Sequence, residues 1–262
     1  MDLGINGKRA LVLASSRGLG LGVASALVAE GAAVMITGRS GERLEAAAAK
    51  LSAAGPGRAI ALPLDFGAAD AVEVLARESV ARLGGVDILV NNTGGPPPGP
   101  ITAVAPETWT TQFELMVRRI ITLTGLLLPG MVERGWGRVL TIASTSVVEP
   151  IPNLGISNSL RSALIGWSKT LASEVGRSGV TVNVLMPGRI QTERIGELDR
   201  ANAERSGRSV DEIADAARAA IPLGRYGTVE EFGAVGAFLV SQPASYITGS
   251  AIRCDGGAVR SV

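Results

Sequence analysis

Short apolar runs alternate along the whole chain with longer segments of helical spacing, and this alternation limits the possible folds more than any other feature. Continuous apolar runs rich in β-branched residues are typical of strands buried on both faces of a parallel sheet. Right-handed crossovers then give an α/β, doubly wound, parallel seven-stranded sheet with helices on both faces. The expected strands are residues 9–14, 33–37, 58–64, 86–92, 138–144, 180–187 and 250–257. The expected helices are residues 17–30, 41–54, 68–83, 106–134, 156–178 and 228–240.

The length of 262 residues suits one large α/β domain, and no shift of composition or internal repeat marks a second one. We therefore predict a single domain over residues 1–262. Segment 189–225 differs from the rest because it is polar and rich in Arg, Glu and Ala. A long insertion at the carboxyl edge of a strand is typical of a lid over a ligand cleft, so we expect a substrate lid at about 189–225.

Composition and charge exclude several classes of protein. The net charge is +1, and no Lys/Arg cluster is interleaved with aromatic residues, so we expect no nucleic acid partner. Histidine is absent, which excludes Ser-His-Asp triads and histidine-ligated metals, and we expect no metal. The single cysteine, Cys254, forbids a disulfide within the chain and favours a reducing, cytoplasmic location. The N-terminus lacks a signal layout and the apolar segment 120–131 is too short to span a bilayer, so we expect no membrane association.

A glycine-rich turn, ASSRGLGLG at 14–22, follows the first expected strand and opens directly into a helix. Its glycines let the backbone approach a phosphate, and the helix N-terminus offers free N–H groups and a positive dipole end. The spacing of Gly18, Gly20 and Gly22 does not fit the dinucleotide fingerprint G-x-G-x-x-G. A tight strand-to-helix turn of any α/β protein is the alternative, but the place after the first strand favours a phosphate site.

The turn resembles the T-G-x-x-x-G-x-G element of the short-chain dehydrogenase/reductase family. Gly18 and Gly20 match, whereas Leu13 and Ala14 replace the threonine and the first glycine. Alanine is tolerated there if its φ is negative and is unfavourable if the turn needs a positive φ. The resemblance implies a Rossmann-type fold.

Further motifs extend the resemblance over nearly the whole chain. Residues 91–94 (NNTG) resemble the family's N-N-A-G motif, and Asp65 stands where an adenine-contacting aspartate is found. Pro187-Gly188 with Thr192 resembles the P-G-x-x-x-T element beside the nicotinamide. Segments 221–233 and 246–257 are similar to the C-terminal part of the 3-oxoacyl-carrier-protein reductase branch. The resemblance implies these cofactor-binding residues: Ser16, Arg17, Gly18, Leu19, Gly20, Arg39, Asp65, Phe66, Asn91, Thr93, Gly94, Arg161, Pro187, Gly188, Ile190 and Thr192.

The end of the second strand indicates which nicotinamide cofactor is bound. An acidic residue there would bind the ribose 2′-hydroxyl of NAD, but the strand ends in Gly38 and Arg39. Arg39 and Arg17 would favour the 2′-phosphate of NADP by charge and by bidentate hydrogen bonds. We therefore expect NADP, with NAD as the weaker alternative. Both arginines could instead be ordinary solvated side chains.

The family's four catalytic side chains are a serine, a tyrosine, a lysine and an asparagine, and this chain matches one of them. GRVLTIAS places the serine at Ser144, and ALIGWSKTLASEV aligns the following helix. In that register Ser157 stands at the tyrosine position, Arg161 at the lysine position and Met116 at the asparagine position. Met116 is interpreted as core packing.

This replacement removes the proton donor of the family's reaction. A phenol with a pKa of about 10 can be brought toward neutrality by a nearby cation, whereas an aliphatic hydroxyl cannot, and a serine is too short to reach the same carbonyl. Loss of a general acid lowers a rate by about 10²–10⁴-fold. The chain's two tyrosines, Tyr226 and Tyr246, belong to other motifs.

Three functions remain open on the sequence. We favour an NADP-dependent oxidoreductase that acts on a carbonyl or alcohol substrate through a modified site of Ser144, Ser157 and Arg161. The alternatives are a non-catalytic NADP-binding protein, either a sensor or a partner subunit, and an enzyme with non-redox chemistry. The partner is expected to be a small-molecule substrate. The resemblance implies a homo-oligomer, a tetramer or a dimer, through segments 106–134 and 156–178.

Overall fold

The computed structural model describes residues 2–261, and its centre is one sheet of seven parallel strands. The strand order is β3-β2-β1-β4-β5-β6-β7, so the direction of winding reverses between β1 and β4. The doubly wound seven-stranded sheet predicted above is confirmed, and all seven expected strands are present. Their bounds are β1 Arg9–Val12, β2 Ala33–Gly38, β3 Arg58–Pro63, β4 Ile88–Asn91, β5 Gly137–Ile142, β6 Val180–Pro187 and β7 Ala251–Cys254.

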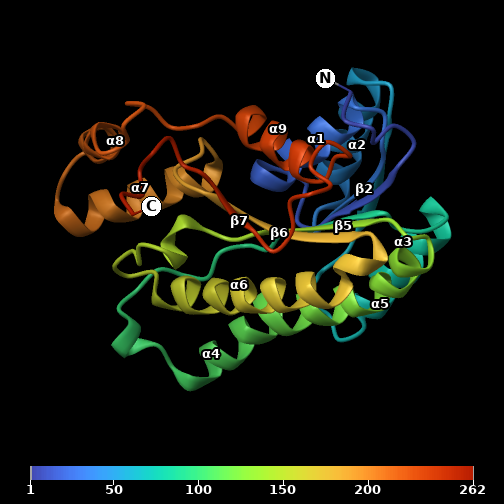
Figure 1. Ribbon diagram of the computed structural model, residues 1–262. Coiled ribbons are helices and arrows are strands. Elements are labelled where there is room, and N and C mark those ends of the chain that lie inside the picture. The colour runs from blue at the N-terminus through green and yellow to red at the C-terminus, as the bar shows by residue number, and fades with distance from the viewer. Residues whose placement is uncertain (1, 262) are drawn as a thin grey trace.

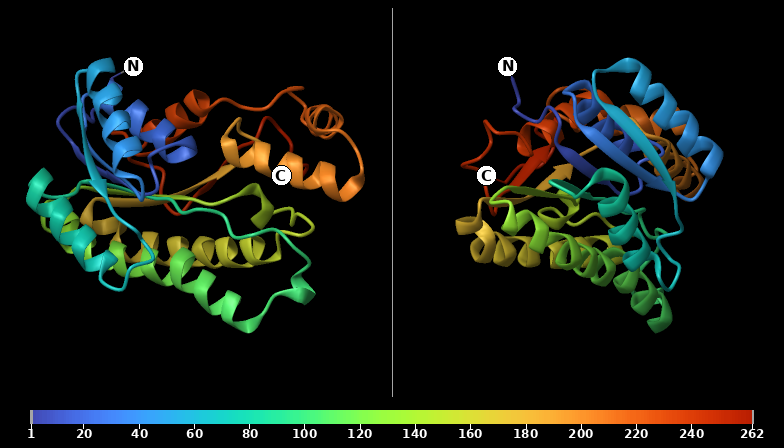
Figure 2. Two further views of the ribbon diagram at one scale, coloured as in Figure 1. Left: turned by 180° about the vertical axis from the view of Figure 1, so that it is seen from behind. Right: turned by 90° about the vertical axis from the view of Figure 1, so that its right-hand side faces the viewer.

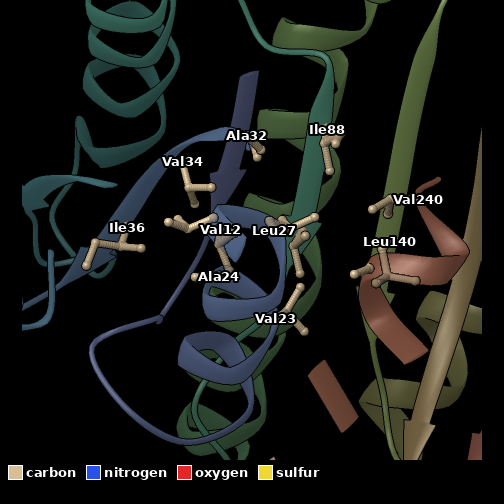
Figure 3. Packing of buried hydrophobic residues seen from close by; sticks show 14 of the residues in the cluster. Val12, Val23, Ala24, Leu27, Ala32, Val34, Ile36, Ile88, Leu140 and Val240 are labelled. Atoms are coloured by element: carbon tan, nitrogen blue, oxygen red, sulfur yellow. The ribbon is translucent and has the colours of Figure 1, made fainter. Parts of the chain in front are cut away.

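The inner strands are largely apolar because they are buried on both faces. On β1, Ala10 and Val12 point into one core, and Leu11 points into the other. Figure 3 shows the first core, where Val12 lies with Val34 of β2 and Ile88 of β4 against the first helix. Period-2 alternation therefore distributes side chains between two apolar layers rather than between core and solvent.

Helices cover both faces of the sheet (Figure 1). The first face carries α1 (Gly18–Ala29), α2 (Gly41–Ala54) and α9 (Val229–Leu239), and the second carries α3 (Ala71–Leu83), α5 (Arg119–Glu133) and α6 (Gly155–Val175). Helices α1 and α9 approach closely at a glycine pair: a Cβ on Gly233 would lie 2.3 Å from the carbonyl oxygen of Gly22. This contact holds α9 against the helix that follows the glycine-rich turn.

The segment predicted as one helix at 106–134 contains three parts. Helix α4 (Pro106–Phe113) continues through a π-helical turn, η2 (Glu114–Arg118), into α5. Together they form 28 residues with a mean hydropathy of 1.5 in the most apolar window, which by length and composition alone is enough to cross a membrane. Of that window, 44% is buried, and side chains such as Leu123 and Leu127 belong to the second core. The helix extends well beyond the apolar run 120–131, so the expectation that this segment is too short to span a bilayer is wrong for the helix as a whole.

The insertion after β6 forms two helices, α7 (Glu193–Ser206) and α8 (Val210–Ala219). They lie at the end of the molecule where α6 begins, as Figures 1 and 2 show from opposite sides. Asp199 on α7 is 3% exposed and binds two partners, Arg189 at 2.6 Å and the hydroxyl of Tyr226 at 2.9 Å. This cluster holds α7 to the segments before and after the insertion. Three short 3-10 turns complete the chain: η1 Ile101–Ala103, η3 Thr145–Val147 and η4 Gly176–Ser178.

Candidate active site

The turn after β1 approaches its neighbours so closely that one position accepts only glycine. A Cβ on Gly20 would lie 2.7 Å from the carbonyl oxygen of Ala14 and 2.8 Å from Nδ2 of Asn92. Ala14 itself has a φ of 45°, in the left-handed region that favours glycine. The turn therefore uses a positive φ where this chain has alanine, which is the unfavourable alternative set out above.

The N-terminus of α1 presents backbone donors at the carboxyl edge of the sheet. The N-cap residue, Arg17, makes no side-chain hydrogen bond to the first turn. Within residues 2–261 the N–H groups of Gly18, Leu19 and Gly20 have no backbone acceptor either. These donors fit a phosphate group.

The side chain of Arg17 is directed at the insertion. Its guanidinium forms an ion pair with Glu193, the first residue of α7. Gly18 also lies against α7, since a Cβ placed on it would be 3.7 Å from Cγ2 of Thr192. The glycine-rich turn and the start of the predicted lid are thus adjacent. Arg17, which was predicted to bind a 2′-phosphate, is instead paired with Glu193.

Arg39 stands exposed just beyond the end of β2. It forms no ion pair with any residue between 2 and 261. Ser16 lies beside the end of the same strand, because a Cβ on Gly38 would be 3.1 Å from its Oγ. Ser16 and Arg39 are therefore neighbours of the position where a nucleotide ribose is predicted.

Sequence reasoning missed the residue that fixes the loop after β3. Arg119 at the start of α5 is 8% exposed, and its guanidinium donates to the carbonyl oxygens of Phe66 (2.5 Å), Gly67 (3.1 Å) and Ala68. Glu114 accepts a further bond from its Nε at 3.1 Å. In the same loop Asp65 is exposed, and its Oδ1 accepts from the N–H of Gly67 at 2.9 Å. The sequence signal that could have indicated this role is a charged residue, Arg119, at the start of an otherwise apolar helical segment.

Two asparagines at the end of β4 serve different neighbours. Asn91 is buried and donates from Nδ2 to Oγ1 of Thr124 on α5 at 3.2 Å, whereas its Oδ1 has no hydrogen-bond partner among residues 2–261. Asn92, which was not among the predicted site residues, donates to the carbonyl oxygens of Leu13 (3.3 Å) and Ala14 (3.2 Å). It therefore ties the end of β4 to the glycine-rich turn. Thr93 and Gly94 follow on the exposed side of the same edge.

The segment after β6 is packed tightly against β7 and the core. Gly188 leaves no room for a side chain, since a Cβ would lie 2.6 Å from Cβ of Asp255. Pro187 accepts a hydrogen bond from Oγ1 of Thr145 at 3.3 Å. Ile190 is 3% exposed within the first core, and Thr192 caps α7 by accepting from the N–H of Ile195 at 3.4 Å. The Ile190 side chain is therefore part of the core, and only the backbone of this residue is left for a ligand contact.

Ser157 and Arg161 lie on the buried side of α6, one turn apart, with exposed fractions of 9% and 8%. Arg161 reaches β5, where its Nη1 donates to the carbonyl oxygen of Ile142 at 2.9 Å. Ser144 follows β5, and its Oγ accepts from the N–H of Ser146 at 3.1 Å. The fold therefore brings all three predicted catalytic residues to the carboxyl end of β5. Met116 is 1% exposed in the π-helical turn, within the second core.

Burial lowers the pKa of Arg161 to about 10, and the positive charge of Arg194 lowers it in addition. Arg161 therefore remains a cation at neutral pH.

Neither tyrosine stands in for a missing phenol in this chain. Tyr226 donates to Asp199 at the insertion, and burial together with that bond raises its pKa above the ordinary value. Tyr246 is fully exposed, at 102% of its reference area. It precedes Thr248, whose Oγ1 accepts from Val182 of β6, near the opposite end of that strand from Pro187. Within residues 2–261 no group of three acidic or thiol side chains could hold a metal.

Comparisons with known proteins agree over almost the whole chain. The family model described as Enoyl-(Acyl carrier protein) reductase matches residues 13–259. D-beta-hydroxybutyrate dehydrogenase of Cupriavidus necator is 33% identical over 260 residues, which cover 97% of this chain and 99% of that protein. The 3-oxoacyl-[acyl-carrier-protein] reductase FabG of Aquifex aeolicus is 32% identical over 259 residues, covering 98% and 99%.

Solved structures show the same likeness in three dimensions. L-sorbose reductase from Gluconobacter frateurii, in complex with NADPH and L-sorbose, superposes with a TM-score of 0.94 at 33% identity, and 100% of each chain is covered.

Proposed function

We propose that this chain, which belongs to the short-chain dehydrogenase/reductase family, is an NADP-dependent oxidoreductase acting on a carbonyl or alcohol substrate through a modified site. The carrying observation is that Ser144, Ser157 and Arg161 converge at the carboxyl end of β5, beside a turn with uncapped backbone donors. Fold alone would not support an activity, but a polar set at this edge does.

The residues around the turn suit NADP. The phosphate bridge would lie on the N–H groups of Gly18, Leu19 and Gly20, and the 2′-phosphate on Arg39 with Ser16 beside it. Arg17 would contribute only when it is released from Glu193. The loop Asp65–Phe66, which Arg119 anchors, would take the adenine. The NADPH-bound L-sorbose reductase supports the same cofactor.

The nicotinamide side would be held by the segments that end β4 and β6. Asn91, Thr93 and Gly94 supply one edge, and Pro187, Gly188, Ile190 and Thr192 supply the other, largely through their backbone. Arg161 would reach the nicotinamide ribose from α6. When bound, NADPH supplies a hydride to a substrate carbonyl carbon.

In reduction the carbon–oxygen π bond breaks, a C–H bond forms with the hydride, and an O–H bond forms with a proton. We assign the orientation of the carbonyl oxygen to the hydroxyls of Ser144 and Ser157. The guanidinium of Arg161 stabilises the negative charge that develops on that oxygen. We assign the proton to solvent water, because the hydroxyls of Ser144 and Ser157 are too weakly acidic and Arg161 is kept as the cation that stabilises the oxyanion. Residues 189–225 would close over the substrate as a lid.

A non-catalytic NADP-binding protein is the second candidate, and the lack of an ionisable phenol at Ser157 favours it. Titration with NADPH and NADH, followed by a panel of ketones and alcohols read at the nicotinamide absorbance, separates the two. Binding with turnover supports the oxidoreductase, and binding without turnover supports the second candidate. Absence of nucleotide binding would contradict both.

A double variant tests whether the missing phenol limits turnover. Ser157→Tyr with Arg161→Lys should raise ketone reduction by about 10²-fold, at the lower end of what a general acid supplies. An unchanged rate in a folded variant that binds NADPH would mean that Ser157 and Arg161 do not occupy the proposed positions. Oligomeric state, which the family resemblance predicts to be a tetramer or a dimer, is read by light scattering on the same samples.

A further inference from the structure

The cation Arg161 is buried, and the described part of the chain gives it no anionic partner. Among residues 2–261 no carboxylate lies within 4 Å of its guanidinium. Its Nη1 donates to the carbonyl oxygen of Ile142, but Nε and Nη2 have no acceptor in the described part of the chain. A buried charge without a partner is costly to keep, so a ligand that carries the opposite charge fits this position.

A second arginine is directed at the same place from the insertion. Arg194 on α7 donates from Nη2 to the carbonyl oxygen of Pro96 at 2.9 Å, and it lies across Gly95, where a Cβ would be 3.3 Å from that nitrogen. Its contact with Glu197 is long, at 3.4 Å, and about two-fifths of the Arg194 side chain is exposed (39%). The charge of Arg194 therefore remains largely available.

Backbone pairing places Arg194 near the start of α6. The segment that carries Gly95 and Pro96 continues to Gly99, whose N–H donates to the carbonyl oxygen of Asn153 at 2.8 Å and which pairs with Leu154. Leu154 immediately precedes α6, the helix of Ser157 and Arg161. The segment that Arg194 contacts is therefore paired with the residue just before the helix that carries Arg161. Burial is the main cause of the lowered pKa of Arg161, and the charge of Arg194 lowers it further, in agreement with this placement.

A nucleotide alone would not neutralise these charges. The ribose that Arg161 would reach carries neutral hydroxyls, and an oxidised nicotinamide adds a positive charge. The free edge of Arg161, formed by Nε and Nη2, offers two parallel N–H donors. A carbonyl oxygen and an adjacent carboxylate oxygen in one plane match these donors.

We propose that the substrate is a 2-oxo acid, or the corresponding 2-hydroxy acid, whose carboxylate is held by Arg161 and covered by Arg194. This inference rests on the proposed oxidoreductase function and names its substrate class. One guanidinium then both holds the substrate and polarises the reacting carbonyl. Ser157, being short, leaves the space that the acid group occupies.

The test compares 2-oxobutanoate with its uncharged methyl ester in a complex that cannot react. Protein saturated with NADP⁺ is titrated with each by calorimetry, after nucleotide affinity has been measured separately. We expect the acid to bind at least about 10-fold more tightly than the ester. Equal affinities, or tighter binding of a phosphate monoester such as glycerol 3-phosphate, would overturn the proposal.

Variants identify the residues responsible. Arg161→Gln should weaken binding of the acid about 30-fold and binding of the ester little, and Arg161→Lys should fall between. Arg194→Gln should weaken the acid about 5-fold with nucleotide affinity unchanged, whereas Arg200→Gln, an exposed arginine on the same helix, should change neither. Since Arg194 is a surface residue, its variant decides the question even if Arg161→Gln does not fold. Equal losses for acid and ester would overturn the assignment.

Failure of the proposed function remains distinguishable from failure of this inference. If the wild-type protein binds no nucleotide, the oxidoreductase proposal is wrong. The comparison of acid and ester, made on the nucleotide-free protein, then still decides whether the two arginines form an acid site.

Discussion

The predicted nucleotide site around the turn after β1 and the predicted reaction site around β5 and α6 use different kinds of groups. Around β1 and β2 the chain uses backbone N–H groups and close approaches, and its buried arginine, Arg119, is satisfied by carbonyl oxygens and Glu114. Around β5 and α6 the proposed chemistry would depend on three side chains, and the buried Arg161 has one carbonyl partner and, within residues 2–261, no acidic one. A binding surface made of backbone groups keeps its hydrogen-bond donors when side chains are replaced, whereas a set of catalytic side chains is altered by a single substitution. Under the proposed function, this difference would let the scaffold match the family while Ser157 and Arg161 stand at the positions where the family pattern predicts tyrosine and lysine.

The largest effect should come from filling the closest approach on the nucleotide side. Gly20→Ala places a methyl group against the backbone of Ala14, which cannot move away cheaply, so we expect a loss of about 3 kcal/mol in unfolding free energy and loss of NADPH binding. Urea denaturation and fluorescence titration measure both. Gly166→Ala is the matched control, since its helix position has nothing within 4 Å and alanine there should add about 0.5–1 kcal/mol. A Gly20→Ala protein as stable as wild type would show that the backbone of Ala14 does not exclude a side chain at position 20.

Arg119 tests whether a buried side chain also organises the nucleotide side. Arg119→Ala removes donors to three loop carbonyls and should lower the unfolding free energy by about 2–3 kcal/mol. It should also weaken the binding of NADPH and the binding of NADH by similar factors, because both nucleotides contain the adenine. Arg118→Ala, on the exposed neighbour, serves as control. Selective loss of one nucleotide would contradict a purely positioning role.

Arg39 tests the assignment of the 2′-phosphate. Arg39→Ala should weaken NADPH by about 10-fold, near 1.4 kcal/mol, and leave NADH unchanged, because one exposed charge-assisted contact is lost. Glu193→Gln should strengthen NADPH slightly by releasing Arg17. Lys50→Ala, an exposed cation farther along α2, should alter neither affinity. Equal affinities of the wild-type protein for NADPH and NADH would remove the claim.

The smallest effect is a gain. Ala14 holds a φ of 45°, so Ala14→Gly should relieve strain and stabilise the protein by about 1 kcal/mol, less the entropy that glycine adds to the unfolded chain. Denaturant midpoints at constant m-value measure it. A loss of stability would mean that the methyl group contributes packing that outweighs the strain.

Local patterns predicted the scaffold well for a physical reason. Strands such as β1 and β4 are apolar on both faces and are flanked by helical spacing, so their type and the parallel order follow from short-range periodicity. The glycine-rich turn was found because its residue types are themselves the constraint. The helix at 106–134 was predicted as a unit, but its π-helical turn at Glu114–Arg118 was not, since it depends on packing.

The sequence by itself determined the seven-stranded doubly wound sheet and the place of the glycine-rich turn. Motif alignment also grouped Ser144, Ser157 and Arg161 as one predicted site. Only the tertiary structure decided that Ala14 takes a positive φ, that Arg17 pairs with Glu193, and that Arg119 fixes a loop 51–53 residues away. It also decided that Arg161 is buried against the carbonyl oxygen of Ile142 and that Arg194 reaches the carbonyl oxygen of Pro96. Periodicity records which face of an element is buried, whereas pairing of charges depends on contacts between segments distant along the chain, and no local pattern encodes those.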